Sequence, residues 1–195
     1  LPNQWKASTA LPFEKTLEID SDLRFKSVSL SKFVDSPIMC GLHQKTYDLV
    51  EPAFKKNFPV HRLQVFGDEA SHCEVPEEIV RKFRAMVTQA AFLTGSHPFD
   101  QFDILLAVTT HLPPNGLEHA RSSLNVLAPS ALSSASQLRG WDRLLIPHEF
   151  MHAWCGKYRR PDGMVSHSFH ALENTELLWV YEGLTQYLGE LIEFD

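Results

Sequence analysis

The sequence has few cysteines, and their arrangement excludes two classes of protein. Cys40, Cys73 and Cys155 are the only three, they are widely separated, and they form no C-x-x-C pair. A dense disulfide framework of the kind that holds small secreted domains together is therefore excluded. Reduced thiols are the simpler interpretation, and they favour a reducing compartment such as the cytoplasm.

The chain also lacks an excess of positive charge and any long apolar run. It has 24 acidic and 18 basic side chains, a net charge of −6, which is poorly suited to binding phosphate backbones. No segment approaches the roughly 18 uninterrupted apolar residues of a spanning helix, and no basic stretch followed by an apolar one opens the sequence. We expect no nucleic-acid partner and no membrane span, and the sequence leaves the oligomeric state open.

What the sequence does contain is enough apolar material for a proper core. Hydrophobic residues make up 44% of the 195 positions. Up to about residue 75, short apolar runs alternate with breakers, as in "LEIDSDLRFKSVSLSKFVDSPIMCG" and "FPVHRLQVFGD", a pattern typical of strands. We therefore predict an α+β fold with a β-rich region at 1–75 and a second region, with both helices and strands, at 76–195.

The second region alternates predicted helices and strands. Helical spacing of apolar residues predicts a helix from Pro76 to about Gly95. "FDILLAVTT" (102–110) and "LEHARSSLNVL" (117–127) predict extended runs in one sheet, separated by "LPPNG". A small-residue loop follows at 128–137, and then come helices at 141–157 and 175–192. Pro147 removes a backbone hydrogen bond, so the first of these helices either kinks there or begins anew.

The segment "IPHEFMHAW" (146–154) carries the strongest chemical signal. On a helix, residues four positions apart share a face, so His148 and His152 can direct two imidazoles at one metal ion. Glu149 lies one step round the helix, where it can accept the proton of the attacking water as general base. Zinc suits this chemistry, because it lowers the pKa of water and polarises a carbonyl. The alternative is a chance match in a chain with ten histidines.

A zinc hydrolase needs a third protein ligand, and "ELLWVYEGLTQYLGEL" (176–191) offers Glu182. This glutamate lies among Leu178, Trp179, Leu184 and Leu188, where we expect it to be buried. A buried carboxylate is costly unless a cation neutralises it. The alternative is a salt bridge to a buried arginine or lysine.

These motifs together resemble the active-site region of the glycyl aminopeptidase family, zinc metallopeptidases of the gluzincin group with a thermolysin-like catalytic domain. "HEFMHAWCGKYRRP" and "ENTELLWVYEGLTQYLGEL" carry the match in order and in spacing. The resemblance implies that zinc is bound by His148, His152 and Glu182 and that Glu149 is the general base. It also implies a mixed β-sheet followed by the active-site helices.

A second segment, "NGLEHARSS" (115–123), resembles a strand of the same family. The resemblance implies that Glu118 holds the free α-ammonium group of the substrate, with Gly116 on the same strand as a further substrate-binding residue. The alternative is an exposed strand glutamate without a role. Asn115 and Cys155 depart from the family pattern, which puts the substrate preference in question. Related proteins continue into a helical subdomain, often with a PDZ domain, that we expect to be absent here.

For three further histidines we predict structural or surface positions in place of a ligand role. Strand alternation turns His119 away from the side that Glu118 faces, so we expect packing or hydrogen bonding there. His167 and His170 lie in the polar connection before the last helix and are by default surface residues, with oxyanion contacts as the alternative.

The sequence therefore predicts a zinc-dependent peptidase, an aminopeptidase with preference for N-terminal glycine and a peptide as its partner. Two alternatives stay open. One is a metallo-endopeptidase with the same zinc site, in which Glu118 anchors nothing. The other is a non-catalytic, peptide-binding remnant of the protease fold.

Overall fold

The structure is a computed structural model, and it describes residues 1–14, 23–166, 168 and 170–193. Part of the segment predicted as extended around residues 15–22 lies outside this range, as does His167. None of the described helices is long and apolar enough to cross a bilayer.

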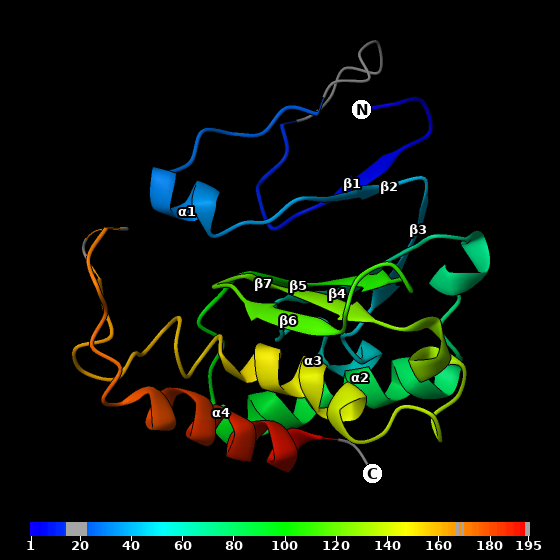
Figure 1. The fold of residues 1–195 in the computed structure, drawn as a ribbon. Helices are drawn as coiled ribbons and strands as arrows, with labels where there is room; N and C mark the ends of the chain where they lie inside the picture. The colour runs from blue at the N-terminus through cyan, green and yellow to red at the C-terminus, as the bar shows by residue number, and fades with distance from the viewer. Residues whose placement is uncertain (15–22, 167, 169, 194–195) are drawn as a thin grey trace.

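A five-stranded mixed sheet forms the middle layer (Figure 1). Its strands follow the spatial order β3 (His43–Asp48), β4 (Val60–Gly67), β5 (Gln101–Val108), β7 (Ser122–Leu127) and β6 (Asn115–Glu118). The central β4–β5 and β5–β7 pairs are parallel, and the outer β3–β4 and β6–β7 pairs are antiparallel. The short strand β6 is therefore an edge of the sheet, next to the helices that carry the chemical motifs.

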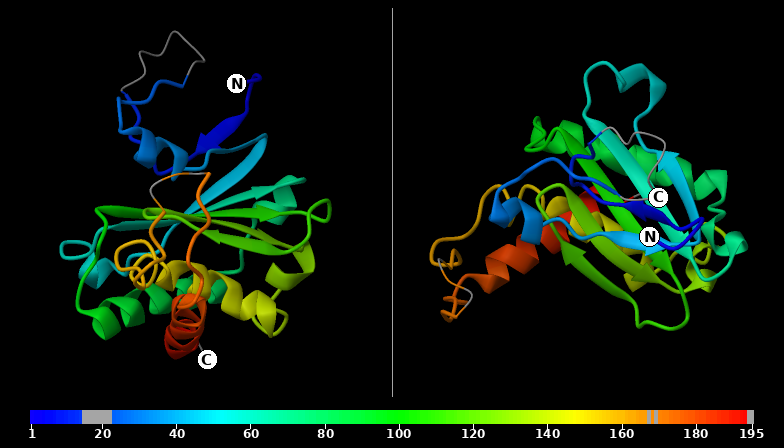
Figure 2. Two further views of the ribbon diagram at one scale, coloured as in Figure 1. Left: turned by 60° about the vertical axis from the view of Figure 1, so that its left-hand side comes forward. Right: turned by 90° about the horizontal axis from the view of Figure 1, so that it is seen from above.

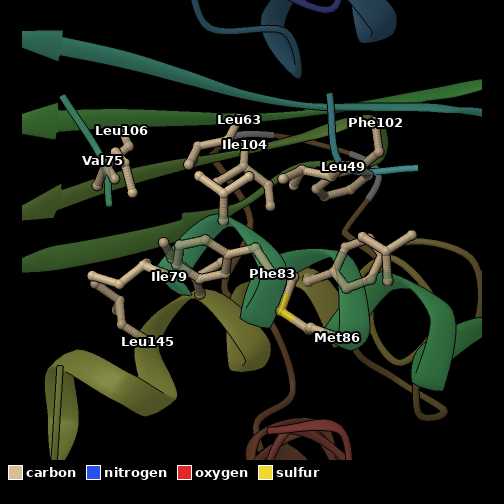
Figure 3. Close-up of a cluster of buried hydrophobic side chains, with 14 of the residues drawn as sticks. Leu49, Leu63, Val75, Ile79, Phe83, Met86, Phe102, Ile104, Leu106 and Leu145 are labelled. Atoms are coloured by element: carbon tan, nitrogen blue, oxygen red, sulfur yellow. The ribbon is translucent and has the colours of Figure 1, made fainter. Parts of the chain in front are cut away.

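Two helices, α2 (Glu77–Thr94) and α3 (Trp141–Met151), cover one face of this sheet, and α4 (Leu178–Ile192) packs against both of them on the same side. The main core lies between the sheet and these helices. Figure 3 shows Leu63 and Ile104 of the sheet above Phe83 and Met86 of α2, and all four side chains are buried. Burial of such side chains contributes about 1.5–3 kcal/mol each. Short 3₁₀ turns at Pro52–Phe54, Ala70–Cys73 and Pro129–Leu132 join the elements.

The N-terminal part of the chain lies over the opposite face of the sheet, as both views in Figure 2 show. It contains the antiparallel pair β1 (Lys6–Ser8) and β2 (Met39–Gly41) and the short helix α1 (Leu30–Val34).

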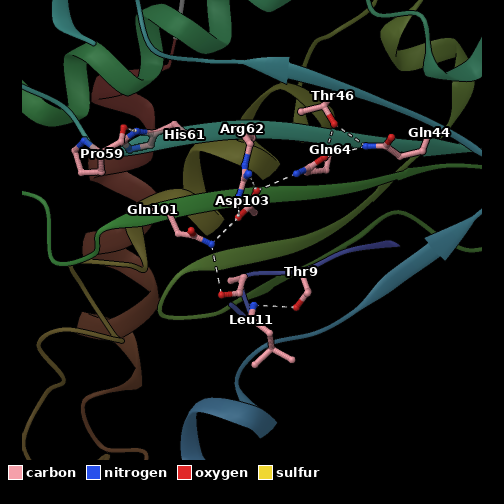
Figure 4. Close-up of polar contacts among 11 residues, drawn as sticks. Thr9, Leu11, Gln44, Thr46, Pro59, His61, Arg62, Gln64, Gln101 and Asp103 are labelled. Atoms are coloured by element: carbon pink, nitrogen blue, oxygen red, sulfur yellow. Dashed lines mark hydrogen bonds and ion pairs between the residues drawn. The ribbon is translucent and has the colours of Figure 1, made fainter. Parts of the chain in front are cut away.

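Beneath this N-terminal layer, polar side chains of the sheet form a closed network (Figure 4). The carboxylate of Asp103 accepts hydrogen bonds from Nε and Nη2 of Arg62 at 2.7 and 2.9 Å, from Gln64 at 3.1 Å and from Gln101 at 3.3 Å. Asp103 is fully buried, so this charge is held by protein donors alone among the residues described.

Most predicted elements are confirmed, and the differences have local causes. The predicted helix 76–95 is α2, which ends where Gly95 takes a left-handed conformation, and the run 102–110 contains β5. The run 117–127 was wrongly predicted as one element. A turn at residues 119–121 reverses the chain, so β6 folds back onto β7. Residues 30–34 were also predicted as extended but form α1, because the Ser29 side chain caps the helix by accepting from the Lys32 amide.

The helix that begins at Trp141 is shorter than predicted, because regular helix ends at Met151 instead of Lys157. Pro147 lies inside α3 without splitting it. Beyond Met151 the chain continues in turns, with Lys157 donating to the His152 carbonyl. The predicted helix 175–192 is α4, which begins three residues later than expected.

Candidate metal centre and active site

The three predicted metal ligands meet at one point between α3 and α4. The Nε2 atoms of His148 and His152 are 3.0 Å apart. Oε2 of Glu182 lies 3.2 Å from the first of these nitrogens and 3.5 Å from the second. The two histidines follow from the i, i+4 spacing on α3, whereas Glu182 depends on how α4 packs against it.

A glycine allows the two helices to approach this closely. A Cβ atom on Gly189 would lie 3.2 Å from the backbone of His148, so the helices are in direct contact there. Seven residues earlier on α4, Glu182 then lies level with the two imidazoles. Between these points Thr185 is fully buried, and its hydroxyl lies 3.3 Å from Nδ1 of His152.

The surroundings of His152 fix which ring nitrogen faces the other ligands. Its Nδ1 lies 3.0 Å from the carbonyl oxygen of Cys155, which can only accept a hydrogen bond. Nδ1 therefore carries the proton, and the lone pair of Nε2 points at His148 and Glu182. Metal-binding histidines are commonly oriented in this way by a backbone carbonyl.

The donor set fits a zinc ion. Zinc binds imidazole nitrogens and carboxylate oxygens at about 2.0–2.2 Å, which puts the ligand atoms of a tetrahedral site about 3.3 Å apart. The three separations here, 3.0, 3.2 and 3.5 Å, lie around that value. Two imidazole nitrogens and a carboxylate oxygen converge here, and a cation would be a common partner for all three. Three protein ligands also match the number in a catalytic zinc site, which keeps its fourth position open.

The expected burial of Glu182 was wrong. Its side chain is 49% exposed, and Trp179 and Leu184 beside it are exposed as well. The face of α4 that packs inward carries Tyr181, Thr185, Gly189 and Ile192. The ligand role of Glu182 therefore depends on its distance from the two histidines, and the cost of burying a carboxylate gives no argument for it.

Glu149 lies buried beneath strand β6. It is 6% exposed, and its Oε2 atom has no hydrogen-bond partner among the described residues. A Cβ atom on Gly116 would lie 2.7 Å from Cγ of Glu149, so any larger residue would force this side chain to shift. The structure thus gives Gly116 a clear steric role, which is to let Glu149 approach the strand.

Burial is the main cause that raises the pKa of Glu149, to about 8, and the negative charges of Glu118 and Glu182 add to it. A cation beside Glu182 would favour the ionised form of Glu149 and oppose this shift.

Glu118 lies on the same face of β6 as Gly116, two residues further on, and points toward the helices. A carboxylate oxygen of Glu118, one of Glu149 and a ring nitrogen of His152 all lie within 4.8 Å of one another. The hydroxyl of Tyr181 donates a short hydrogen bond to Glu118. Burial alone would raise the pKa of Glu118, but this hydrogen bond and the positive charge of Lys157 lower it, so Glu118 is ionised.

His119 and His170 lie outside the group of proposed ligands, as predicted. His119 is buried, and its Nδ1 lies 3.3 Å from Asp35, which also accepts from the Ala120 amide and from Lys157. These contacts hold the turn after Glu118 in place. Burial opposes the change, but the contacts lower the pKa of Asp35 to about 2. His170 is exposed.

Sequence reasoning missed two residues of the site, Tyr181 and Thr185. Both appear as ordinary members of the inward face of α4. Their partners lie far away in the sequence, with Glu118 63 positions before Tyr181 and His152 33 positions before Thr185. The one signal available was the position of Tyr181 directly before the proposed ligand Glu182.

Comparison with known proteins bears on the same segment. A model of the M61 glycyl aminopeptidase family matches residues 142–195. This range runs from the start of α3 through α4 and contains the three proposed ligands and Glu149, whereas β6 lies outside it. No curated protein matches the chain.

The fold also matches a solved structure, the crystal structure of the aminopeptidase N family protein from Idiomarina loihiensis. The TM-score is 0.76 at 22% sequence identity, and the match covers 96% of this chain and 31% of that one. The chain thus spans less than a third of that protein's length and shares its mixed α+β fold. Over residues 142–195, which include α3 and α4, the chain resembles the M61 glycyl aminopeptidase family. The resemblance indicated by the motifs in this range is confirmed, whereas the segment 115–123 lies outside the match.

Proposed function

We propose that this chain is a zinc-dependent aminopeptidase that removes single N-terminal residues from peptides. The observation that carries the proposal is the position of His152, which belongs to two groups at once. It lies with His148 and Glu182 in the candidate metal centre, and it lies within 4.8 Å of the carboxylates of Glu118 and Glu149.

Each residue has a role in this reaction. His148, His152 and Glu182 would hold the zinc ion, which when bound supplies a Lewis acid for the scissile carbonyl. Glu149 accepts the proton of the attacking water and returns it to the leaving amine. Its buried position excludes bulk water from this proton transfer. Glu118, kept ionised by Tyr181, pairs with the α-ammonium group of the substrate.

The spacing of these groups favours an aminopeptidase over an endopeptidase. A single residue of an extended peptide spans about 3.3–3.6 Å. The carboxylate of Glu118 lies within 4.8 Å of a ring nitrogen of His152. This short separation suits a substrate whose terminal ammonium group lies at Glu118 and whose first carbonyl lies at the metal centre.

Strand β6 offers a docking edge for the rest of the peptide. It is the last strand of the sheet, so one side of its backbone has no strand partner among the described residues. An extended peptide can add to such an edge through main-chain hydrogen bonds. A thermolysin-like arrangement and a preference for N-terminal glycine are what the family resemblance implies, and we include both in the proposal.

Two alternatives differ in what they require. A metallo-endopeptidase would use the same zinc ligands but would not need an ionised carboxylate facing Glu149. A non-catalytic peptide-binding protein would not need Glu149, whose unpartnered burial is costly in a protein without chemistry. The arrangement of Glu118 and Glu149 therefore favours the aminopeptidase.

The deciding experiment measures zinc and peptide cleavage together. Elemental analysis should find about one zinc per chain and a strong loss in His148→Ala, while Glu182→Ala should also weaken binding. The zinc-loaded protein should cleave glycyl dipeptides with a free N-terminus and spare their N-acetylated forms, and Glu118→Ala should raise KM for the free form. Equal cleavage of both forms would support the endopeptidase, and bound zinc without cleavage would support the binding protein.

A further inference from the structure

Tyr181 contacts both Glu118 and His152, although it is neither a proposed metal ligand nor the proposed general base. Its hydroxyl donates to Glu118, the proposed anchor of the substrate amine. Its ring packs against the ring of His152, with the centroids 4.8 Å apart. One side chain thus spans from the anchor to a proposed metal ligand.

The ring is held in place from a second direction by Gly156. This residue has a φ of +134°, a conformation that favours glycine. A Cβ atom there would lie 2.7 Å from Cζ of Tyr181, so the backbone approaches the hydroxyl end of the ring. With His152 and Gly156 both in contact with it, and with only 7% of its surface exposed, Tyr181 has little freedom to move aside.

The first residue of a substrate would span the same interval as this ring. Its ammonium group would lie at Glu118 and its carbonyl at the metal centre, so its Cα atom would pass alongside Tyr181. A side chain on that Cα would clash with the Tyr181 ring, which is held in place by His152 and Gly156. A glycine has no such side chain.

We propose that Tyr181 determines the subsite for the first residue of the substrate: its hydroxyl positions Glu118, and its ring restricts the subsite to small side chains. This inference rests on the proposed aminopeptidase function. It separates two contributions of one residue, because the hydroxyl acts on every free N-terminus and the ring acts only on substrates that carry a side chain.

Dipeptide binding tests both contributions without turnover. We would measure calorimetrically how glycyl-phenylalanine and leucyl-phenylalanine bind to zinc-loaded Glu149→Gln protein, with the N-acetylated dipeptides for comparison. Tyr181→Phe removes only the hydroxyl and should weaken binding of both free dipeptides about tenfold, the effect of losing one hydrogen bond to a charged group. Binding of the acetylated forms and the preference for glycine should not change.

Tyr181→Leu removes the ring as well. Compared with Tyr181→Phe, Tyr181→Leu should shift the ratio of the two dissociation constants in favour of the leucyl dipeptide by about fivefold or more. Tyr187→Phe is the matched control, because Tyr187 lies on the same helix and is 59% exposed. It should bind both dipeptides like the parent, and all variants should keep the parent's zinc content.

The possible failures can be told apart. If the parent binds free and acetylated dipeptides equally, Glu118 is no anchor, and both the aminopeptidase function and the subsite are overturned. If the parent prefers free dipeptides but Tyr181→Phe binds them within twofold of the parent, or Tyr181→Leu leaves the preference for glycine unchanged, only the subsite is overturned. Loss of zinc in Tyr181→Phe would also contradict it, since the residue would then act through the metal centre.

Discussion

Two buried carboxylates on opposite faces of one sheet have opposite surroundings. Asp103 on β5 faces the N-terminal layer and accepts hydrogen bonds from Arg62, Gln64 and Gln101. Glu149 on α3 lies under β6, has one oxygen without a partner among the described residues, and has two other carboxylates near it. Both are nearly inaccessible to solvent.

The difference separates a carboxylate that holds the fold together from one available for chemistry. A carboxylate whose lone pairs all accept hydrogen bonds has none left to take a proton. A buried carboxylate with a free lone pair can accept one readily. Removing each one should therefore damage a different property. Four changes test this comparison.

The largest effect is expected from Glu149→Gln. The amide keeps the shape of the side chain but cannot accept a proton, so kcat for peptide hydrolysis should fall by about 10²–10⁴, the usual contribution of a general base. Zinc content and the thermal midpoint should stay near those of the parent. Loss of zinc together with activity would contradict the general-base role.

Asp103→Ala should damage stability and leave the chemistry intact. It removes the acceptor for Arg62 and two glutamines, and breaking a buried pair costs about 3–5 kcal/mol of unfolding free energy. Denaturant titration measures this cost. Asp100→Ala is the matched control, because the Asp100 carboxylate is 70% exposed beside Arg121 and should contribute less than about 1 kcal/mol. Equal losses in both variants would remove the distinction.

A buried histidine on the helix side of the sheet extends the comparison to pH. His61 is next to Arg62 on β4, so its side chain points to the face opposite the Asp103 network. Burial, opposed by a hydrogen bond to the Pro59 carbonyl, lowers the pKa of His61 to about 4, and the nearby His97 adds to the decrease. The unfolded chain then binds a proton below about pH 6.5 that the folded chain does not bind until about pH 4. The free energy of unfolding should fall as pH decreases through this window, by about 3 kcal/mol in all.

His61→Phe should remove this part of the acid sensitivity. The measurement is the unfolding free energy of both proteins between pH 7 and pH 4, and the difference between the two curves isolates His61 from the carboxylates. Parallel curves would show that His61 does not titrate as the structure indicates.

The smallest effect is expected from Gly116→Ala. The added methyl would displace the Glu149 side chain without changing its chemistry, so we expect kcat to fall about tenfold, as for a misplaced catalytic group. Zinc content should not change. Gly183→Ala is a suitable control, because a Cβ atom there meets nothing within 4 Å. An unchanged kcat in Gly116→Ala would mean that Glu149 has room to move.

The sequence predicts those parts of the molecule that depend on local pattern. The helix α2 follows from its apolar spacing and from Gly95, and the pair His148 and His152 follows from one helical turn. The turn between β6 and β7 was missed, because residues 119–121 contain neither glycine nor proline. It is stabilised by Asp35, 85 positions before Ala120.

Only those residues of the site that belong to a local sequence motif could be predicted. Glu182 lies beside the two histidines as proposed, but the expected burial was wrong, since Leu178, Trp179 and Leu184 around it are exposed. Tyr181 was overlooked, because a tyrosine on an apolar helix face is most often core. Its contact with Glu118 depends on how α4 packs under β6, and nothing in the local sequence encodes that distance.

The short length of β6 affects the tendency of the chain to aggregate with other copies of itself. Exposed sheet edges are templates on which unrelated chains can aggregate, and natural proteins often keep such edges short. The strand has only four residues, and two prolines, Pro113 and Pro114, precede it directly. Such an edge would be long enough for the end of the proposed peptide substrate but too short to start a growing intermolecular sheet.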